Sequence, residues 1–401
     1  MEDLDGARLL TSGDVAGLLA EVVGPSGASL EGWSLSHVDA DPGRSTTATY
    51  KVRLTQPGGL VTRTVGLTVR AQGPSAADAR AAVVRSGEVQ AVGWLFPHDP
   101  DLPGLARAAS RVQMTALLNQ SGFVKIQPGD LELELIGYRP RRRAVLKVSA
   151  PRIGLVAYVK VFRPAQFEAV RQRHEILSAA GLPSPRVLAA TTDHVLVIES
   201  TVGRPLARAL FDRPTPVTAE QIVELLDALP AQVAELSRRP PWAASVRHYA
   251  GVVEANLPSL SRRLSHLVHQ ISTGLADLPA GEDPTHGDFY EAQIFVQPGR
   301  VSGLIDVDTI GPGRRADDLA CLLAHLNCIQ RMNSAQAVVA SQLIQDWLPV
   351  FEARVDPVEL RLRAAAVVVS LATGPFRCQE PDWRRETEAI VAKAERLVAE
   401  V

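Results

Sequence analysis

The stretch that most constrains the fold lies at residues 284–320, where two short polar motifs flank an apolar hairpin pattern. His-Gly-Asp at 286–288 opens the stretch, and Gln293 follows five residues after the Asp. Two apolar runs joined by a Gln-Pro-Gly turn come next, which predicts a β-hairpin. The second run ends on Asp306, and Asp308 stands two residues further on. Polar side chains at the mouth of such a hairpin are expected to lie close together.

The chemistry that these polar residues favour is phosphoryl transfer, which needs a base, metal ligands and fixed geometry. In a kinase catalytic loop the base Asp precedes a metal-binding Asn by five residues, and a second metal-binding Asp follows on the next hairpin. Asp288, Gln293 and Asp306 occupy those relative positions, and Asp308 is a candidate auxiliary ligand. Oxygen ligands of this type suit Mg²⁺, which shares itself between carboxylates and phosphates. The alternative is a loop whose Asp residues only cap turns.

At these residues the chain resembles the aminoglycoside phosphotransferase family, whose signature is HGDxxxxN followed by a hydrophobic strand and IDxx. The sequence departs from the signature at Gln293, which resembles the HGDxHxGQ motif of the maltokinase branch, although that branch has His where this chain has Tyr290. The Gln carbonyl oxygen retains metal-binding capacity with a reach that differs by one methylene. The resemblance implies an α+β fold, a bilobal protein-kinase-like architecture that uses ATP and Mg²⁺ to phosphorylate a hydroxyl of a small molecule.

Residues 121–202 carry the pattern expected for the N-lobe of such a kinase. Strand-like runs are followed by a helical run, in the order 131–140, 144–150, 154–162 and then helix 164–181, with further strands at 186–191 and 194–200. Lys160 lies in the third strand, where the resemblance implies a phosphate-binding lysine. Its acidic partner is expected on the following helix. Glu175 is favoured over Glu168 by the family's Lys-to-Glu distance.

Two further parts of this lobe are expected to contact the nucleotide. The turn between its first two strands is not Gly-rich, so it does not predict a backbone cradle for phosphates. It carries Arg142 and Arg143 instead, whose guanidinium groups suit bidentate phosphate binding; a solvated basic turn is the equal alternative. Glu199 begins the expected hinge, where adenine would bond to the backbone.

Residues 1–120 do not fit the kinase pattern and are expected to form an additional N-terminal α+β cap domain. Alternating polar and apolar residues predict an antiparallel sheet with one wet face. The expected elements are a helix at 12–24 capped by Ser12, strands at 29–40, 45–55, 60–71 and 88–96, and helices at 75–87 and 105–118. The whole resembles the extra N-terminal module of maltokinase-like proteins.

Residues 203–401 are helical in pattern apart from the catalytic hairpin, as a helical C-lobe requires. Helices are expected at 218–239, with Thr218 as cap, and at 246–272, 314–330, 334–354, 356–373 and 382–401. Gly311-Pro312-Gly313 is expected to make a tight turn. Asp317 and Asp318 open the next helix, where the macrodipole favours a structural role over a catalytic one.

The acceptor is expected to be small and polar, because the segment between Asp306 and the next expected helix is too short to form the activation segment of a protein kinase. The residues expected to line its pocket are Tyr290, Glu291, Asp308, Arg377 and Trp383. The Gln variant of the motif favours a sugar or aminosugar. Two other functions stay open: an aminoglycoside or macrolide phosphotransferase, and a nucleotide-binding pseudokinase without activity.

The bulk properties exclude several other classes. The chain has 401 residues, of which 46% are hydrophobic, and a net charge of −2, so neither nucleic acid nor a membrane surface is expected as a partner. The three cysteines lack zinc-ligand spacing, and Cys321 and Cys328, seven residues apart in an apolar helical run, are expected to be buried thiols. The absence of a leader pattern and of an apolar run of about 18 residues predicts a cytoplasmic protein. The sequence leaves open the oligomeric state and the choice between ATP and GTP.

Overall fold

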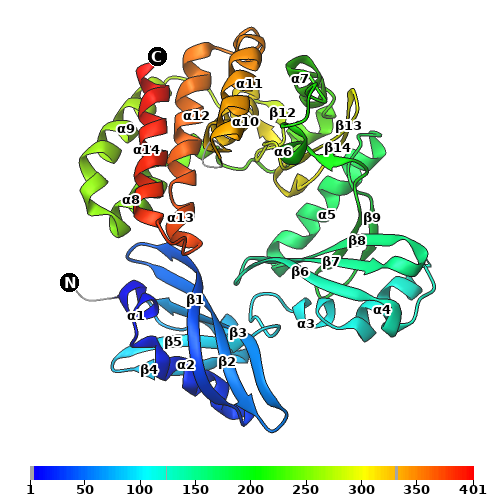
Figure 1. Cartoon of the computed structure of the whole chain (residues 1–401), viewed down its shortest axis with the longest axis vertical. Coiled ribbons are helices and arrows are strands. Elements are labelled where there is room, and N and C mark those ends of the chain that lie inside the picture. Colours follow the sequence, from blue (N-terminus) through cyan, green and yellow to red (C-terminus); the bar gives the residue numbers. More distant parts are fainter. Residues whose placement is uncertain (1–3, 123, 330–332) are drawn as a thin grey trace. The chain divides into compact units, whose positions relative to one another are not determined.

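The computed structural model describes residues 4–122, 124–329 and 333–401, and these fall into two compact units. The first unit holds both large sheets and comprises Met1–Glu168, Val187–Ser200 and Phe376–Pro381. The second unit holds the catalytic hairpin and most of the helices and comprises Ala169–Arg186, Thr201–Pro375 and Asp382–Val401. Antiparallel sheets followed by a helical C-terminal part confirm the predicted α+β class (Figure 1).

The first sheet of unit one has five antiparallel strands in the order β1-β2-β3-β5-β4. Their bounds are β1 Ser29–Asp41, β2 Ser45–Gln56, β3 Gly59–Arg70, β4 Ala82–Ser86 and β5 Val89–Leu95. The helices α1 (Ala7–Thr11) and α2 (Val15–Val23) precede it, and Leu18 and Leu19 of α2 are buried in the core of this sheet. The predicted strands are confirmed. The helix expected at 12–24 is confirmed as α2, although its N-cap is Asp14 and not Ser12. The helix expected at 75–87 was wrong, because this segment forms a short 3₁₀ turn at Ala76–Arg80 followed by β4.

The second sheet has the order β6-β7-β8-β10-β9, again antiparallel. Its strands are β6 Glu132–Arg139, β7 Arg143–Ala150, β8 Leu155–Phe162, β9 Val187–Ala190 and β10 Val195–Glu199. In β7 every second side chain is buried, as the period of two in its sequence requires. The helices α3 (Leu105–Ala108) and α4 (Arg111–Gln120) contribute Leu105 and Met114 to this second core, although the sequence pattern assigned them to the cap. Ser110 caps α4 and separates it from α3.

Unit two is built around two small sheets that carry the polar motifs. The hairpin of β13 (Ile294–Gln297) and β14 (Arg300–Leu304) pairs with β11 (Arg204–Pro205). The strand β12 (Asp283–Thr285) leads into the His-Gly-Asp motif and pairs with β15 (Gly311–Gly313). The Gly-Pro-Gly segment is therefore a short strand and not the tight turn expected from its composition.

Helices make up the rest of unit two and share one large core. They are α5 (Pro164–Ala179, its first residues in unit one), α6 (Leu206–Ala209), α7 (Ala219–Asp227), α8 (Val246–Asn256), α9 (Ser261–Gly274), α10 (Arg315–Ile329), α11 (Ser334–Glu352), α12 (Pro357–Leu371), α13 (Gly374–Arg377, its end in unit one) and α14 (Trp383–Ala399). Thr218 caps α7 as predicted, through a capping box with Gln221. The largely buried α12 packs against α8, α9, α10 and α14 (Figure 1). No helix among the described residues is both long and apolar enough to span a membrane.

Candidate active site

The backbone of the His-Gly-Asp motif is held by a buried carboxylate on the first turn of α10. The amides of His286 and Gly287 each donate to Asp318 over 2.8 Å, one to each carboxylate oxygen. Asp318 is fully buried, and burial raises its pKa to about 6. Gly287 has a φ of 79°, and a Cβ there would lie 2.8 Å from the carbonyl oxygen of Thr309. The loop therefore depends on Gly287 for its close approach to Thr309 and on Asp318 for its hydrogen bonds.

The imidazole of His286 connects this loop to the strand before Asp306. Its Nε2–H donates to the carbonyl oxygen of Ile305 over 3.0 Å, and its Nδ1 accepts from the amide of Asp288 over 3.3 Å. One nitrogen donates and the other accepts, which is the pattern of a neutral imidazole. His286 is completely buried, so it fixes the segments that carry Asp288 and Asp306 at the same point.

Gln293 and Asp306, the predicted metal ligands, come together in unit two. Gln293 is 4% exposed, and its Nε2 donates to Oδ2 of Asp306 over 3.5 Å. Asp306 has a φ of 56°, a left-handed conformation that is uncommon for a residue other than Gly. Within the described ranges no group of three or more His, Cys, Asp or Glu side chains is arranged to hold a metal. Mg²⁺ bound by one or two carboxylates, waters and phosphate oxygens requires no such group, and the oxygens of Gln293 and Asp306 suit it.

Asp308 and the segment after it are tied to α5. Nε2 of His174 lies 3.8 Å from Oδ1 of Asp308, while its Nδ1–H donates to the carbonyl oxygen of Pro185. The neighbouring Arg173, also buried, donates from Nε to the carbonyl oxygen of Ile310 over 2.9 Å. The sequence pattern singled out neither residue, because only the tertiary fold brings this face of α5 to the Asp308 segment.

Tyr290 and Glu291 lie in an apolar environment next to the motif. The Tyr290 ring stacks on His325 of α10 with centroids 4.1 Å apart, and burial lowers the pKa of His325 to about 4, so the imidazole is neutral at pH 7. Burial, followed by the charges of Asp288 and Asp306, raises the pKa of Tyr290. Glu291 is 6% exposed, and burial raises its pKa to about 7. His325 could not be predicted as a site residue from the sequence, because a single histidine within an apolar helix gives no indication of function.

The predicted nucleotide-binding residues Lys160, Arg142, Arg143 and Glu199 belong to unit one. Lys160 is 6% exposed in β8, opposite Val145 and Leu196 of the neighbouring strands. Arg143 begins β7 and Glu199 ends β10. Nε of Arg142 lies 3.1 Å from a carboxylate oxygen of Asp39 in β1, so this guanidinium already has an anionic partner.

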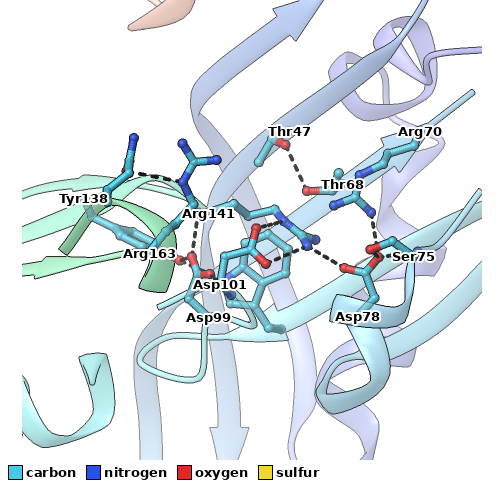
Figure 2. A network of polar contacts seen from close by, with 12 residues as sticks. Thr47, Thr68, Arg70, Ser75, Asp78, Asp99, Asp101, Tyr138, Arg141 and Arg163 are labelled. Atoms are coloured by element: carbon cyan, nitrogen blue, oxygen red, sulfur yellow. Dashed lines mark hydrogen bonds and ion pairs between the residues drawn. The ribbon is translucent and has the colours of Figure 1, made fainter. Parts of the chain in front are cut away.

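The neighbouring residue Arg141, which the sequence analysis did not single out, is the best-connected side chain of that turn (Figure 2). It is 6% exposed and has a φ of 60°. Its amide donates to Asp99 over 2.8 Å, and its guanidinium donates to Asp78 over 2.5 Å and to Asp101 over 3.0 Å. The hydroxyl of Tyr138 also donates to Asp99, over 2.7 Å. The turn between β6 and β7 is therefore held by carboxylates from residues 78–101.

The remaining predicted residues are Glu175, Trp383 and Arg377, and the structure shows interactions with other groups for each of them. Glu175 on α5 is half-exposed and pairs with Arg171 one turn earlier on the same helix. Trp383 begins α14 in unit two, where the guanidinium of Arg384 lies 4.4 Å from its ring centroid. Arg377 belongs to unit one, and its charge, after burial and the opposing effect of Asp39, helps to lower the pKa of His37. The predicted roles of these residues stay predictions.

Unit two also contains a cavity of about 440 Å³ that Gly287 and Thr309 line from one side. Its other walls come from the segment 238–247, the end of α9 and the strand β15. The residues expected to line the acceptor pocket were Tyr290, Glu291, Asp308, Arg377 and Trp383, and none of them lines this cavity.

Comparisons with known proteins identify the family and support the fold. The family model described as "Phosphotransferase enzyme family" (APH) matches residues 137–352. A solved choline kinase from Cryptosporidium parvum Iowa II has a TM-score of 0.50 at 10% identity, covering 72% of this chain and 95% of that one. A choline/ethanolamine kinase family protein from Mesorhizobium loti has a TM-score of 0.49 at 17% identity (72% and 92%). A thermostable mutant of aminoglycoside phosphotransferase APH(4)-Ia, in ternary complex with AMP-PNP and hygromycin B, has 0.49 at 15% (72% and 98%).

No curated protein matches the chain by sequence. At these low identities the solved structures show the fold alone, while the family model covers more than half of the chain and includes the catalytic hairpin. The chain therefore belongs to the phosphotransferase enzyme family and is a small-molecule kinase with a protein-kinase-like fold.

Proposed function

We propose that the protein transfers the γ-phosphoryl group of ATP to a hydroxyl of a small, polar, sugar-like molecule. The observation that carries the proposal is the arrangement around His286, which ties the loop of Asp288 to the strand before Asp306. Gln293 meets Asp306 in the same place. A base and two oxygen ligands fixed together are the protein's main contribution to phosphoryl transfer.

In the proposed reaction the acceptor oxygen forms a bond to the γ-phosphorus, while the bond from that phosphorus to the bridging oxygen of ADP breaks. ADP leaves with the electron pair of the broken bond, and the hydroxyl proton passes to a carboxylate oxygen of Asp288. Asp318 acts as a positioning residue, because it holds the two amides that precede Asp288.

The proposal assigns Mg²⁺ to Gln293 and Asp306, with Asp308 as an auxiliary ligand. When bound, the ion neutralises charge on the phosphates. Lys160 is proposed to bind phosphates, and Glu199 to begin the hinge for adenine. Structural neighbours in complex with AMP-PNP or ADP support the use of a nucleotide.

The basic turn is proposed to support nucleotide binding through Arg143 and Arg142. Because Asp39 already pairs with Arg142, phosphate binding by that residue requires the guanidinium to be shared or released.

The acceptor is proposed to be a sugar or sugar derivative, with antibiotics and choline-like amines as the competing classes. Structural neighbours that represent these competing classes include a macrolide 2'-phosphotransferase from Brachybacterium faecium, for the antibiotics, and the choline/ethanolamine kinases, for the amines. Aminoglycosides, macrolides and choline carry positive charge, and sites for them require acidic or aromatic groups. The arginines that line the cavity beside Gly287 disfavour such cationic acceptors and so favour the sugar class.

The test is a screen for acceptor-dependent release of ADP in the presence of Mg²⁺. The panel contains neutral, anionic and amino sugars, aminoglycosides, macrolides, choline and a generic protein substrate. We expect turnover with a sugar derivative and identification of a phosphate monoester by mass spectrometry. Phosphorylation of the protein substrate, with none of the small hydroxyl compounds, would overturn the proposal.

A further inference from the structure

The cavity beside the catalytic loop is large enough for a monosaccharide derivative. Its volume of about 440 Å³ lies within the range of roughly 300–1,000 Å³ typical of small-molecule sites. Gly287, the residue before Asp288, and Thr309, the residue after Asp308, both line it. The cavity therefore reaches the two segments that carry the proposed base and the auxiliary metal ligand, and all of its walls belong to unit two.

Two of the arginines that line the cavity are neutralised by carboxylates. Arg314 donates to both carboxylate oxygens of Glu359. Arg363 donates to Glu359 and also to Asp317, in each case over 2.6 Å. These two cations and two anions balance, so this wall adds no net charge to the cavity.

Three further arginines, Arg238, Arg239 and Arg247, also line the cavity, and the hydrogen bonds of the first two go to backbone carbonyl oxygens. Nη1 of Arg239 donates to the carbonyl oxygen of Gly287 over 3.2 Å, and Nη1 of Arg238 donates to the carbonyl oxygen of Pro312 over 3.3 Å. Arg247, on the first turn of α8, also lines the cavity. Across residues 4–122, 124–329 and 333–401, none of these three arginines pairs with a carboxylate. The cavity therefore has an excess of positive charge.

One further feature of the wall that carries these arginines favours an anion. The α8 helix begins at the same wall, with no acidic residue in its first turn and no side-chain cap from Ser245. The N-terminus of a helix attracts negative charge, and the first turn of α8 contains Arg247 and His248.

We propose that this cavity binds an oxyanion, a phosphate or carboxylate group carried by the acceptor, so that the acceptor is an anionic polyol such as a sugar phosphate or sugar acid. The inference rests on the proposed function for the acceptor hydroxyl, which must reach Asp288. Arg238, Arg239 and Arg247 supply charged donors. A cationic acceptor of the aminoglycoside or choline type would meet repulsion from the same arginines.

The test is a binding measurement, so its result is independent of turnover. The full-length chain with Asp288→Asn is titrated calorimetrically with glucose 6-phosphate, ribose 5-phosphate, gluconate, glucose, glucosamine and inorganic phosphate. At least one anionic polyol should bind more tightly than glucose and glucosamine. Adding Arg247→Gln should weaken that binding about tenfold or more, because a charge-assisted hydrogen bond is lost. Arg247 is exposed, so thermal unfolding should show a folded variant.

The matched control is Arg262→Gln, which removes an exposed arginine of α9 that does not line the cavity and should leave binding unchanged. Arg238→Gln should repeat the Arg247→Gln effect. Tightest binding of glucosamine, or anion binding that survives both substitutions, would overturn the proposal. Equal affinity for inorganic phosphate and the sugar phosphates would assign the site to a free anion and would overturn the acceptor assignment. Failure of the ADP-release screen alone bears on the proposed function and leaves this binding result intact.

Discussion

Replacing Glu291 by Gln is expected to stabilise the protein at alkaline pH while changing little at acidic pH. Glu291 is 6% exposed, and its Oε2 is buried without a hydrogen-bond partner among the described residues. Burial raises the pKa of the carboxyl from 4.5 to about 7. Gln has nearly the same shape and carries no charge, so the substitution removes the cost of ionisation and keeps most of the packing.

The sign of the effect follows from proton binding. Between pH 4.5 and about 7 the folded state holds a proton on Glu291 that the unfolded state has released, so the free energy of unfolding falls as the pH rises. Below pH 4.5 both states are protonated and the penalty is absent. At about 1.4 kcal/mol per pKa unit, the full penalty above pH 7 is at most about 3 kcal/mol.

The assay is chemical denaturation of wild type and Glu291→Gln from pH 4.5 to 8.5, without nucleotide or metal. The stability difference should be near zero at the acidic end and approach about 2–3 kcal/mol in favour of the Glu291→Gln variant by pH 8. Glu235→Gln, which removes an exposed carboxylate, serves as the control and should show no such pH dependence. A difference that is constant with pH, or that favours wild type at pH 8, would refute the account of Glu291.

Other predictions concern the network of the basic turn and the roles of two aspartates. Arg141→Met should lower the free energy of unfolding by about 3 kcal/mol, because Asp78 loses a buried partner, whereas Arg152→Met, which removes an exposed ion pair, should cost less than about 1 kcal/mol. Equal losses measured by denaturation would contradict this. Asp306→Ala should abolish the Mg²⁺ dependence of ATP affinity in calorimetry. Asp317→Ala should mainly lower the melting temperature, because it breaks the pair with Arg363; loss of turnover in a well-folded Asp317→Ala protein would assign it a catalytic part.

The regular parts of the fold could be predicted from the sequence because their periodicity is local. The side chains of β7 alternate between buried and half-buried, and Thr218 caps its helix as its position indicates. The errors fall where distant pairing decides the structure. Residues 82–86 form a strand because β5 pairs with them, although the Ala-rich run that leads into them favours a helix. Gly311–Gly313 has a turn composition but pairs with β12.

The meeting of Gln293 and Asp306 could also be predicted, because the two residues lie at the two ends of one hairpin. The catalytic role of Asp288 stays a prediction. The groups that support the motif could not be predicted, since they come from other elements. Arg173 and His174 reach the Asp308 segment from α5, and no local pattern marks them. The sequence predicted only a helix-end role for Asp318. The folded structure reveals that its carboxylate accepts hydrogen bonds from the backbone amides of His286 and Gly287.

The arginines that line the cavity could not be predicted as a group from the sequence either. Arg238 and Arg239 lie in an irregular segment between two short 3₁₀ turns, and Arg247 follows on α8. Their convergence on the wall near Gly287 depends on how that segment packs against β12 and β15. A surplus of charge within one cavity is a property of the tertiary structure, whereas the net charge of the whole chain, −2, gives no indication of it.

The measurement that most directly tests the central claim compares wild type with Asp288→Asn in two assays on the same preparations. ATP affinity in the presence of Mg²⁺ should be similar in the two proteins, because the substitution preserves shape and leaves the metal ligands in place. Acceptor-dependent ADP release should fall by about 10²-fold or more, since a positioned base contributes roughly 10²–10⁴. Near-normal turnover by a folded, ATP-binding Asp288→Asn protein would contradict the assignment of the base and, with it, the proposed mechanism.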